Sequence, residues 1–461
     1  MKLEIQLGKA AERGRRGADD GTRRLLVLGD FAGRGWSGTA AHEPLATRAV
    51  VRVPRQETSD EGGIDAAIEA LSPKIALPPS IAGSPGALEI SALEDFHPDT
   101  LFRRLPVLHE PPRAAAPVAG APGGGDDLAR LLGKQPAAPK PPRSAIDDLI
   151  GQIVASHVVS APASTPLDAA ALGRIMRAVL HEPAFQALEA SWRSLELLAA
   201  RAEEAVEVAL LDVTRAELVT DLLSGRDAAT LDDSALAQRI LAPPGGKPFA
   251  ALIGDFAFGP GAEDTALLAR LGALAASAGA PFIAGAAPAV LGCRSLAAAS
   301  DPAQWEALPP DDAARWQALR RAPAAAWIGL ALPRFLARAP YGAKTGAIDA
   351  FAFEELEGRP APEALCWANG AFLWALALAR GEEADDADDI DDLPFFSFRA
   401  DGDVEAYPSA EVFWGQRAAD AALSRGLVPL LCARNRNAVR LVRQQSIADP
   451  PRALGDDGGD A

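Results

Sequence analysis

Uninterrupted runs of apolar residues recur along this chain, and patterns of helical period separate many of them. A strand that is buried on both faces has this continuous apolar character, which is typical of parallel sheets. The runs predict strands at Arg24–Asp30, Val206–Val213, Phe249–Phe256, Pro281–Ala284, Trp327–Leu332 and Val428–Cys432. Helices are predicted between them at Thr214–Leu223, Glu263–Ala276 and Leu365–Arg380. This alternation predicts the α/β class, with a mixed, largely parallel sheet.

Changes in composition divide the chain into five predicted segments. They are a small N-terminal α/β segment at 1–110, a linker rich in Pro, Ala and Gly at 111–143, an amphipathic helix at 144–160, a larger α/β domain at 161–447 and a disordered tail at 448–461. Clustered proline and glycine disfavour regular structure in the linker. The tail contains too few apolar residues to form a core. Within the first segment, alternation at 2–7 predicts a further strand, and Gly63–Leu71 predicts a helix.

The charge balance excludes several classes of partner. The chain of 461 residues carries 45 basic and 62 acidic side chains, which gives a formal net charge of −17. Nucleic acids and anionic membranes attract clustered Lys and Arg, so neither kind of partner is expected. The sequence shows no signal-peptide core and no apolar run of bilayer length. Cys293, Cys366 and Cys432 lie far apart and match no disulfide framework, which predicts a cytoplasmic protein.

Two features leave open a second class of function, an α/β enzyme or nucleotide-binding protein with a site near Gly33 or Asp255. Gly33–Gly38 (GRGWSG) matches the dinucleotide pattern GxGxxG, and Asp30 and Asp255 each end an apolar strand, where catalytic carboxylates often lie. However, Asp30, Phe31 and Ala32 stand between the apolar run and the glycine pattern, so a mobile surface loop is favoured there. Asp is also common as a capping residue in turns. The five histidines show no ligand spacing, so no metal site is predicted. The chain also contains no complete catalytic or phosphate-binding motif, so the sequence predicts no catalytic residue and no cofactor, and favours a protein that is not an enzyme.

Leu167–Arg193 predicts two short helices around a Glu-Pro turn. Phe185, Leu188 and Trp192 share one helical face, and Pro183 fits the first turn of the second helix. The stretch HEPAFQALEASWR within it resembles a signature near the start of the large subunit of the type VI secretion contractile sheath. Further segments resemble the same subunit in the same order, at Pro248–Phe256, Leu267–Ala284, Leu332–Gly342, Phe351–Glu355, Trp367–Phe372 and Gly426–Ile447.

The N-terminal segment resembles the small subunit of the same sheath. The matching segments are Leu26–Asp30, Ile64–Leu77 and Glu94–Leu108. The resemblance implies a fused small and large sheath subunit, a structural protein that acts by protein–protein assembly. The family's large subunit continues beyond the segment that matches Gln445–Ile447, so the resemblance also implies C-terminal shortening. The implied partners are other sheath subunits, either copies of this chain or native small and large subunits, and the inner tube protein.

Ser144–His157 predicts an amphipathic helix between proline-rich segments. Ser144 is a good N-cap, and the apolar stripe consists of Ile146, Leu149, Ile150, Ile153 and Val154. An isolated helix of this length is marginal in water, so the stripe is expected either to bind a partner or to pack on its own domain. Near the start of the sheath's large subunit, a helix is grasped by the AAA+ ATPase that recycles contracted sheaths. The resemblance implies that these five residues form that handle.

Overall fold

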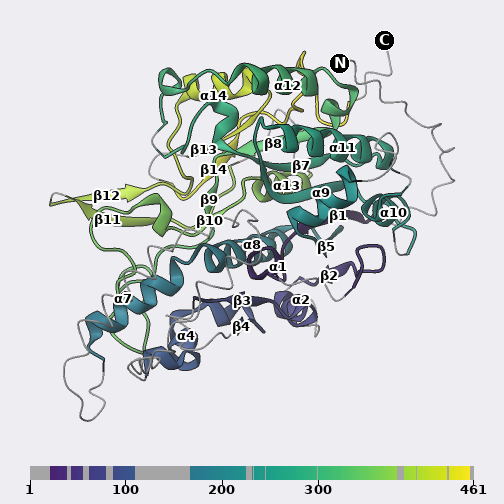
Figure 1. Ribbon diagram of the computed structural model, residues 1–461. Coiled ribbons are helices and arrows are strands. Elements are labelled where there is room, and N and C mark those ends of the chain that lie inside the picture. Colours follow the sequence, from purple (N-terminus) through teal and green to yellow (C-terminus); the bar gives the residue numbers. More distant parts are fainter. Residues whose placement is uncertain are drawn as a thin grey trace, which may run out of the picture.

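A sheet of eight strands lies at the centre of the computed structural model, which describes residues 21–38, 43–55, 62–78, 87–109, 167–224, 231, 233–243, 245–297, 299–381, 389–400, 402–432 and 436–456 (Figure 1). Its strand order is β14-β13-β8-β7-β6-β1-β5-β2. The strands are β1 (Arg23–Gly29), β2 (Val51–Val53), β5 (Val206–Asp212), β6 (Ala251–Phe258), β7 (Phe282–Ala286), β8 (Ile328–Leu332), β13 (Val428–Cys432) and β14 (Val439–Leu441). Neighbours from β13 to β5 are parallel, whereas β14 and β2 are antiparallel strands at the two edges. The predicted α/β class and largely parallel sheet are confirmed.

Helices cover both faces of this sheet. In β1, Leu25 and Val27 belong to one apolar cluster, whereas Leu26 and Leu28 belong to another. The first cluster includes residues of α7 (Ala169–Leu180), α8 (Pro183–Arg201) and α13 (Ala371–Ala379). The second includes residues of α9 (Arg215–Leu223), α10 (Ala235–Leu241), α11 (Ala262–Ala278), α12 (Pro310–Arg320) and α14 (Gln416–Ser424). Successive strand residues thus enter opposite cores, which explains the uninterrupted apolar runs.

Three small antiparallel sheets accompany the central one. They pair β3 (Lys74–Ala76) with β4 (Ala87–Glu89), β9 (Phe335–Leu336) with β10 (Trp367–Ala368), and β11 (Phe396–Ala400) with β12 (Asp403–Tyr407). The hairpin β11–β12 projects from the body at the left of Figure 1. The predicted helix at Leu365–Arg380 begins later than expected, because β10 occupies its first turn. Asn369 Oδ1 then accepts a hydrogen bond from Ala371 N at 3.0 Å, which caps the start of α13.

The N-terminal segment shares the central sheet with the larger domain, in addition to forming the small β3–β4 sheet. Its strand β1 lies between β5 and β6 and is in register with β5 from Arg23 to Gly29. A strand buried on both faces needs hydrogen-bonding neighbours at both edges, and the larger domain supplies them. The remaining N-terminal elements, including α2 (Gly63–Leu71) and α4 (Pro98–Arg104), lie below α8 in Figure 1.

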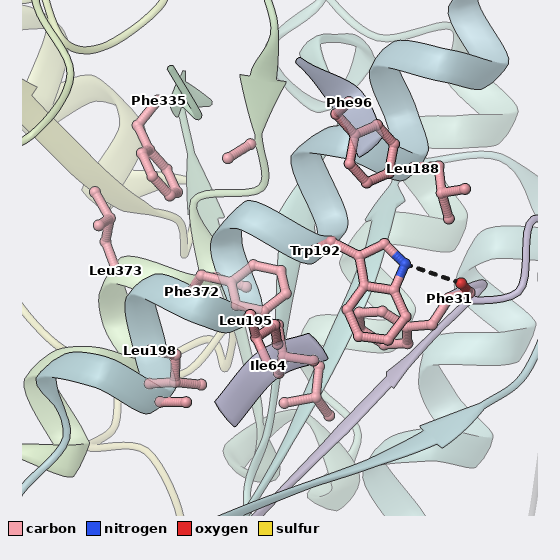
Figure 2. Packing of buried hydrophobic residues seen from close by; sticks show 14 of the residues in the cluster. Phe31, Ile64, Phe96, Leu188, Trp192, Leu195, Leu198, Phe335, Phe372 and Leu373 are labelled. Atoms are coloured by element: carbon pink, nitrogen blue, oxygen red, sulfur yellow. Dashed lines mark hydrogen bonds between the residues drawn. The ribbon is translucent and has the colours of Figure 1, made fainter. Parts of the chain in front are cut away.

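Trp192 of α8 joins the two parts of the chain in one core. Its side chain is fully buried, and its ring packs edge-on against Phe31 with 5.3 Å between the ring centroids. Trp192 Nε1 donates a hydrogen bond to Phe31 O at 3.1 Å (Figure 2). Phe96 makes a similar edge-on contact with Phe185, also on α8. The predicted pair of helices with Pro183 in the first turn is therefore confirmed, and its apolar face packs on the N-terminal segment.

Several predictions concern residues outside those described. They are the strand at 2–7, the linker at 111–143 and the helix at 144–160 with its stripe of Ile146, Leu149, Ile150, Ile153 and Val154. The predicted disordered tail is partly wrong, because residues 448–456 are held by backbone hydrogen bonds. Asp449 N donates to Arg320 O at 2.9 Å, and Gly455 N donates to Ala326 O at 2.7 Å. Within the described ranges, none of the helices combines the length and apolarity needed to cross a membrane.

Candidate functional site

A cleft of about 1180 Å³ lies at the carboxyl ends of β1 and β6. The chain continues from β1 towards β5 on one side and from β6 towards β7 on the other, so the connections diverge between these two neighbouring strands. In open α/β sheets, ligands bind in the crevice at such a topological switch point. The lining includes Asp30 after β1, Thr214 after β5, Asp255 in β6 and Ser191 of α8. This cleft is the best candidate for a binding site.

Two aspartates lie in the cleft. Asp30 accepts hydrogen bonds from Arg34 N at 2.8 Å and from Gly35 N at 2.7 Å. Asp255 Oδ2 accepts a hydrogen bond from Ser191 Oγ at 2.5 Å. Asp255 lies within the stretch of β6, between Gly254 and Ala257, where the register with β7 shifts. Burial raises the pKa of both carboxyls, and the negative charge of Asp30 adds to the effect at Asp255. The sequence predicts both residues at strand ends. Asp30 directly follows β1, whereas Asp255 lies inside β6, which continues to Phe258, and the sheet order brings both to one cleft.

The glycine pattern GRGWSG forms a fixed turn. The short helix α1 (Arg34–Ser37) lies between Gly33 and Gly38, whose φ angles of 71° and 66° are in the left-handed region that favours glycine. A Cβ on Gly35 would lie 2.8 Å from Asp30 Oδ2. The turn is therefore more ordered than the mobile loop that the sequence favours. A dinucleotide site opens with a long helix, whereas α1 has a single turn. Trp36 in this turn lines the cleft, and its side chain is 56% exposed.

A network of four charged side chains fixes the segment beside this turn. Arg34 Nε donates to Asp212 Oδ2 and Arg34 Nη1 donates to Glu217 Oε1, both at 2.8 Å. Arg48 Nη2 donates to the same Glu217 oxygen at 2.7 Å. Although burial alone would raise it, hydrogen bonds from the two arginines lower the pKa of Glu217 to about 2. The network ties Arg34 and Arg48 to β5 and α9, and nothing in the sequence pattern revealed it.

A second charged cluster is buried under α8. Arg338 Nε donates to Glu189 Oε1 at 2.8 Å, and Arg338 Nη1 donates to Glu355 Oε2 at 2.7 Å. Arg193 also donates to Glu189 Oε1, and to the hydroxyl of Tyr341 at 3.2 Å. These contacts fasten the segment after β9 to α8. They explain why the motifs at Leu332–Gly342 and Phe351–Glu355 contain charged residues within otherwise apolar sequence.

The polar groups of the cleft bind mainly to one another. Ser191 donates a hydrogen bond to Asp255. In the part of the chain that the structure describes, no histidine is hydrogen-bonded to Ser191. Asn369 Nδ2 donates to Phe256 O at 3.0 Å, while its oxygen caps α13. Among the described residues, no group of three or more His, Cys, Asp or Glu side chains is arranged to hold a metal ion.

The fold and the cleft therefore define a doubly wound α/β protein with a cleft at the topological switch point of its sheet. Residues 165–448, more than half of the chain, match the family VipB, described as EvpB/VC_A0108, tail sheath N-terminal domain. The chain belongs to this tail sheath family. Over 290 residues it is 30% identical to the type VI secretion system sheath protein TssC1 of Pseudomonas aeruginosa. The aligned part is 59% of this chain and spans 58% of the length of that relative.

Proposed function

We propose that this chain is a structural component of a type VI secretion contractile sheath, with a small-subunit-like and a large-subunit-like part fused in one chain. Its membership of the tail sheath family and its likeness to TssC1 support the sheath assignment. In this proposal the chain is cytoplasmic and acts by assembling with other sheath subunits around the inner tube protein. It performs no catalysis.

One observation carries the fusion proposal: β1 lies between β5 and β6 in the interior of the sheet. The N-terminal segment therefore supplies part of the larger domain's own core. A second contact supports the same proposal, because both carboxylate oxygens of Asp99 in α4 accept hydrogen bonds from Asp349 N, at 3.0 and 3.1 Å. Two parts with such contacts behave as one subunit, and their covalent connection keeps their stoichiometry equal.

Electron microscopy and sedimentation test this function. The purified chain is imaged alone and after mixing with native small and large sheath subunits. We expect rings or rods that contain the chain, because the sheath function requires lateral and axial contacts between subunits. A chain that stays monomeric alone and does not enter sheaths formed by the native subunits would contradict the proposal.

The helix at 144–157 is the proposed handle for the recycling AAA+ ATPase. The variant with Leu149→Asp and Ile153→Asp places charges in the apolar stripe, so binding to the N-terminal domain of the ATPase should be lost. Gln152→Asp adds a charge on the polar side of the same helix and is the matched control. A double variant that loses several kcal/mol of unfolding free energy would show instead that the stripe belongs to the core.

A small-molecule function is the second candidate, and the position of the cleft at the switch point favours it. An enzyme or nucleotide-binding protein of this kind would use the region around Gly33 and Asp255. The test is thermal unfolding with and without added nucleotides, since a ligand that binds the folded state raises the melting temperature. An unchanged melting temperature over a wide range of nucleotide concentrations argues against this function.

A further inference from the structure

The cleft has the dimensions of a site for a polypeptide segment. Its volume of about 1180 Å³ exceeds the roughly 300–1,000 Å³ that is usual for small-molecule pockets. Much of its wall is apolar and includes Leu188, Val219 and Phe256. An extended segment of several residues fits such a space better than a single metabolite does.

Trp36 gives this cleft an exposed aromatic edge. Its side chain is 56% exposed, although tryptophan is usually well buried. Backbone hydrogen bonds from Arg34 N and Gly35 N to Asp30 hold the turn that presents it. Exposed tryptophan beside a pocket is typical of the residues that contribute most to protein–protein binding. These hydrogen bonds fix the backbone of the turn from which the Trp36 side chain projects.

The charge of the cleft indicates which charge a bound molecule would carry. Five acidic and three basic side chains line it, an excess of two negative charges. Two of the arginines are engaged: Arg334 with Glu411 at 2.8 Å, and Arg215 with Asp264. Among the described residues, no basic side chain forms an ion pair with Asp30 or Asp255, and the guanidinium of Arg34 is bound to Asp212 and Glu217.

We propose that this cleft binds a polypeptide segment that inserts an arginine or lysine side chain between Trp36 and the carboxyl groups of Asp30 and Asp255. A cation over an aromatic ring and beside a carboxylate gains both cation–π attraction and charge-assisted hydrogen bonds. The apolar stem of the inserted side chain covers the apolar wall. This inference does not depend on the sheath assignment, because the charges and the cleft belong to the folded chain alone.

Short peptides test the proposal on the full-length chain. The probe is the acetylated, amidated pentapeptide Ala-Ala-Arg-Ala-Ala, and the control peptide carries citrulline, which has the shape of arginine without its charge. Calorimetric titration at low salt should show the arginine peptide binding about tenfold more tightly or better, and added salt should weaken it. Trp36→Ala and Asp255→Asn should each weaken binding, and the latter keeps an acceptor for Ser191. Leu241→Ala, which changes another exposed apolar side chain outside the cleft lining, is the matched control.

Four outcomes would overturn the inference. Equal binding of the arginine and citrulline peptides would remove the electrostatic argument. Binding that is unchanged by both Trp36→Ala and Asp255→Asn, in variants with unaltered thermal unfolding, would place the peptide elsewhere. Free arginine amide that binds as tightly as the peptide would make the cleft a small-molecule site. The absence of binding by every probe would show that the cleft does not bind a basic polypeptide segment.

Discussion

Replacing Arg338 by methionine should cost the protein much of its stability. The Arg338 side chain is 7% exposed, and its guanidinium lies between the side chains of Glu189 and Glu355, which are 0% and 1% exposed. It makes hydrogen bonds of 2.8 Å to Glu189 and of 2.7 and 3.0 Å to Glu355. Methionine fills a similar volume but leaves the carboxylate of Glu355 without its arginine, whereas Glu189 keeps its hydrogen bond from Arg193. Removing one partner of a buried ion pair typically costs about 3–5 kcal/mol, and we expect a loss in that range at pH 7.

The pH dependence separates a charge effect from a packing effect. In the wild type, burial alone would raise the pKa of Glu355, but Arg338 lowers it to about 2, below the ordinary value of 4.5. A lowered pKa contributes stability above about pH 4.5, and this contribution is lost as the pH falls towards 2. In Arg338→Met the carboxyl can escape its unpaired charge by taking up a proton. The cost of the substitution should therefore be smaller at pH 4 than at pH 7.

Urea unfolding at both pH values, followed by circular dichroism, measures these free energies. Arg359→Met is the matched control, because Arg359 pairs with Glu405 at 3.1 Å but is 66% exposed. Exposed pairs contribute little, so this variant should unfold almost as the wild type does. The reasoning fails if Arg338→Met costs no more than Arg359→Met, or if its cost is the same at pH 4 and pH 7.

Three further substitutions test other contacts by the same unfolding measurement. Trp192→Phe removes the hydrogen bond to Phe31 O and leaves a cavity, so the free energy of unfolding should fall by about 1–3 kcal/mol, and no fall would contradict that role. Gly33→Ala should cost about 1–3 kcal/mol, because its Cβ would lie 2.8 Å from a backbone carbonyl oxygen; Gly38→Ala, with a similar φ but open space, should cost less, and equal costs would refute the steric argument. Glu217→Gln should destabilise the protein at pH 7, and the difference from wild type should disappear as the pH falls towards 2, since the wild-type carboxylate has a pKa of about 2; a difference that persists there would contradict the assignment.

The strands could be predicted from the sequence because each one is buried on both faces. The run at Val206–Val213 corresponds to β5 at Val206–Asp212, and Trp327–Leu332 corresponds to β8 at Ile328–Leu332. Their order in the sheet could not be predicted, since every apolar strand is an equally good neighbour for every other. The position of β1 between β5 and β6 depends on packing among residues about 180 positions apart.

The same distinction applies to the candidate site. Asp30 and Asp255 could be identified because each follows an apolar run, but their common cleft follows only from the sheet order. The exposure of Trp36 depends on a turn that the glycine pattern suggested only in outline. The pairing of Arg34 with Glu217 could not be predicted from the sequence, because an isolated arginine and an isolated glutamate usually indicate a solvated surface.

The position of β1 between two strands of the larger domain also determines when this chain can fold during its synthesis. Arg24 and Glu207 face each other in neighbouring strands, yet 183 residues separate them. At about 5–20 residues per second, β1 leaves the ribosome roughly 10–40 s before β5 is made. The apolar strand has no partner in the larger domain during that time, so the N-terminal segment cannot complete its core first. Chaperones that bind nascent chains therefore need to protect this apolar strand for longer than they would in a domain built from local contacts.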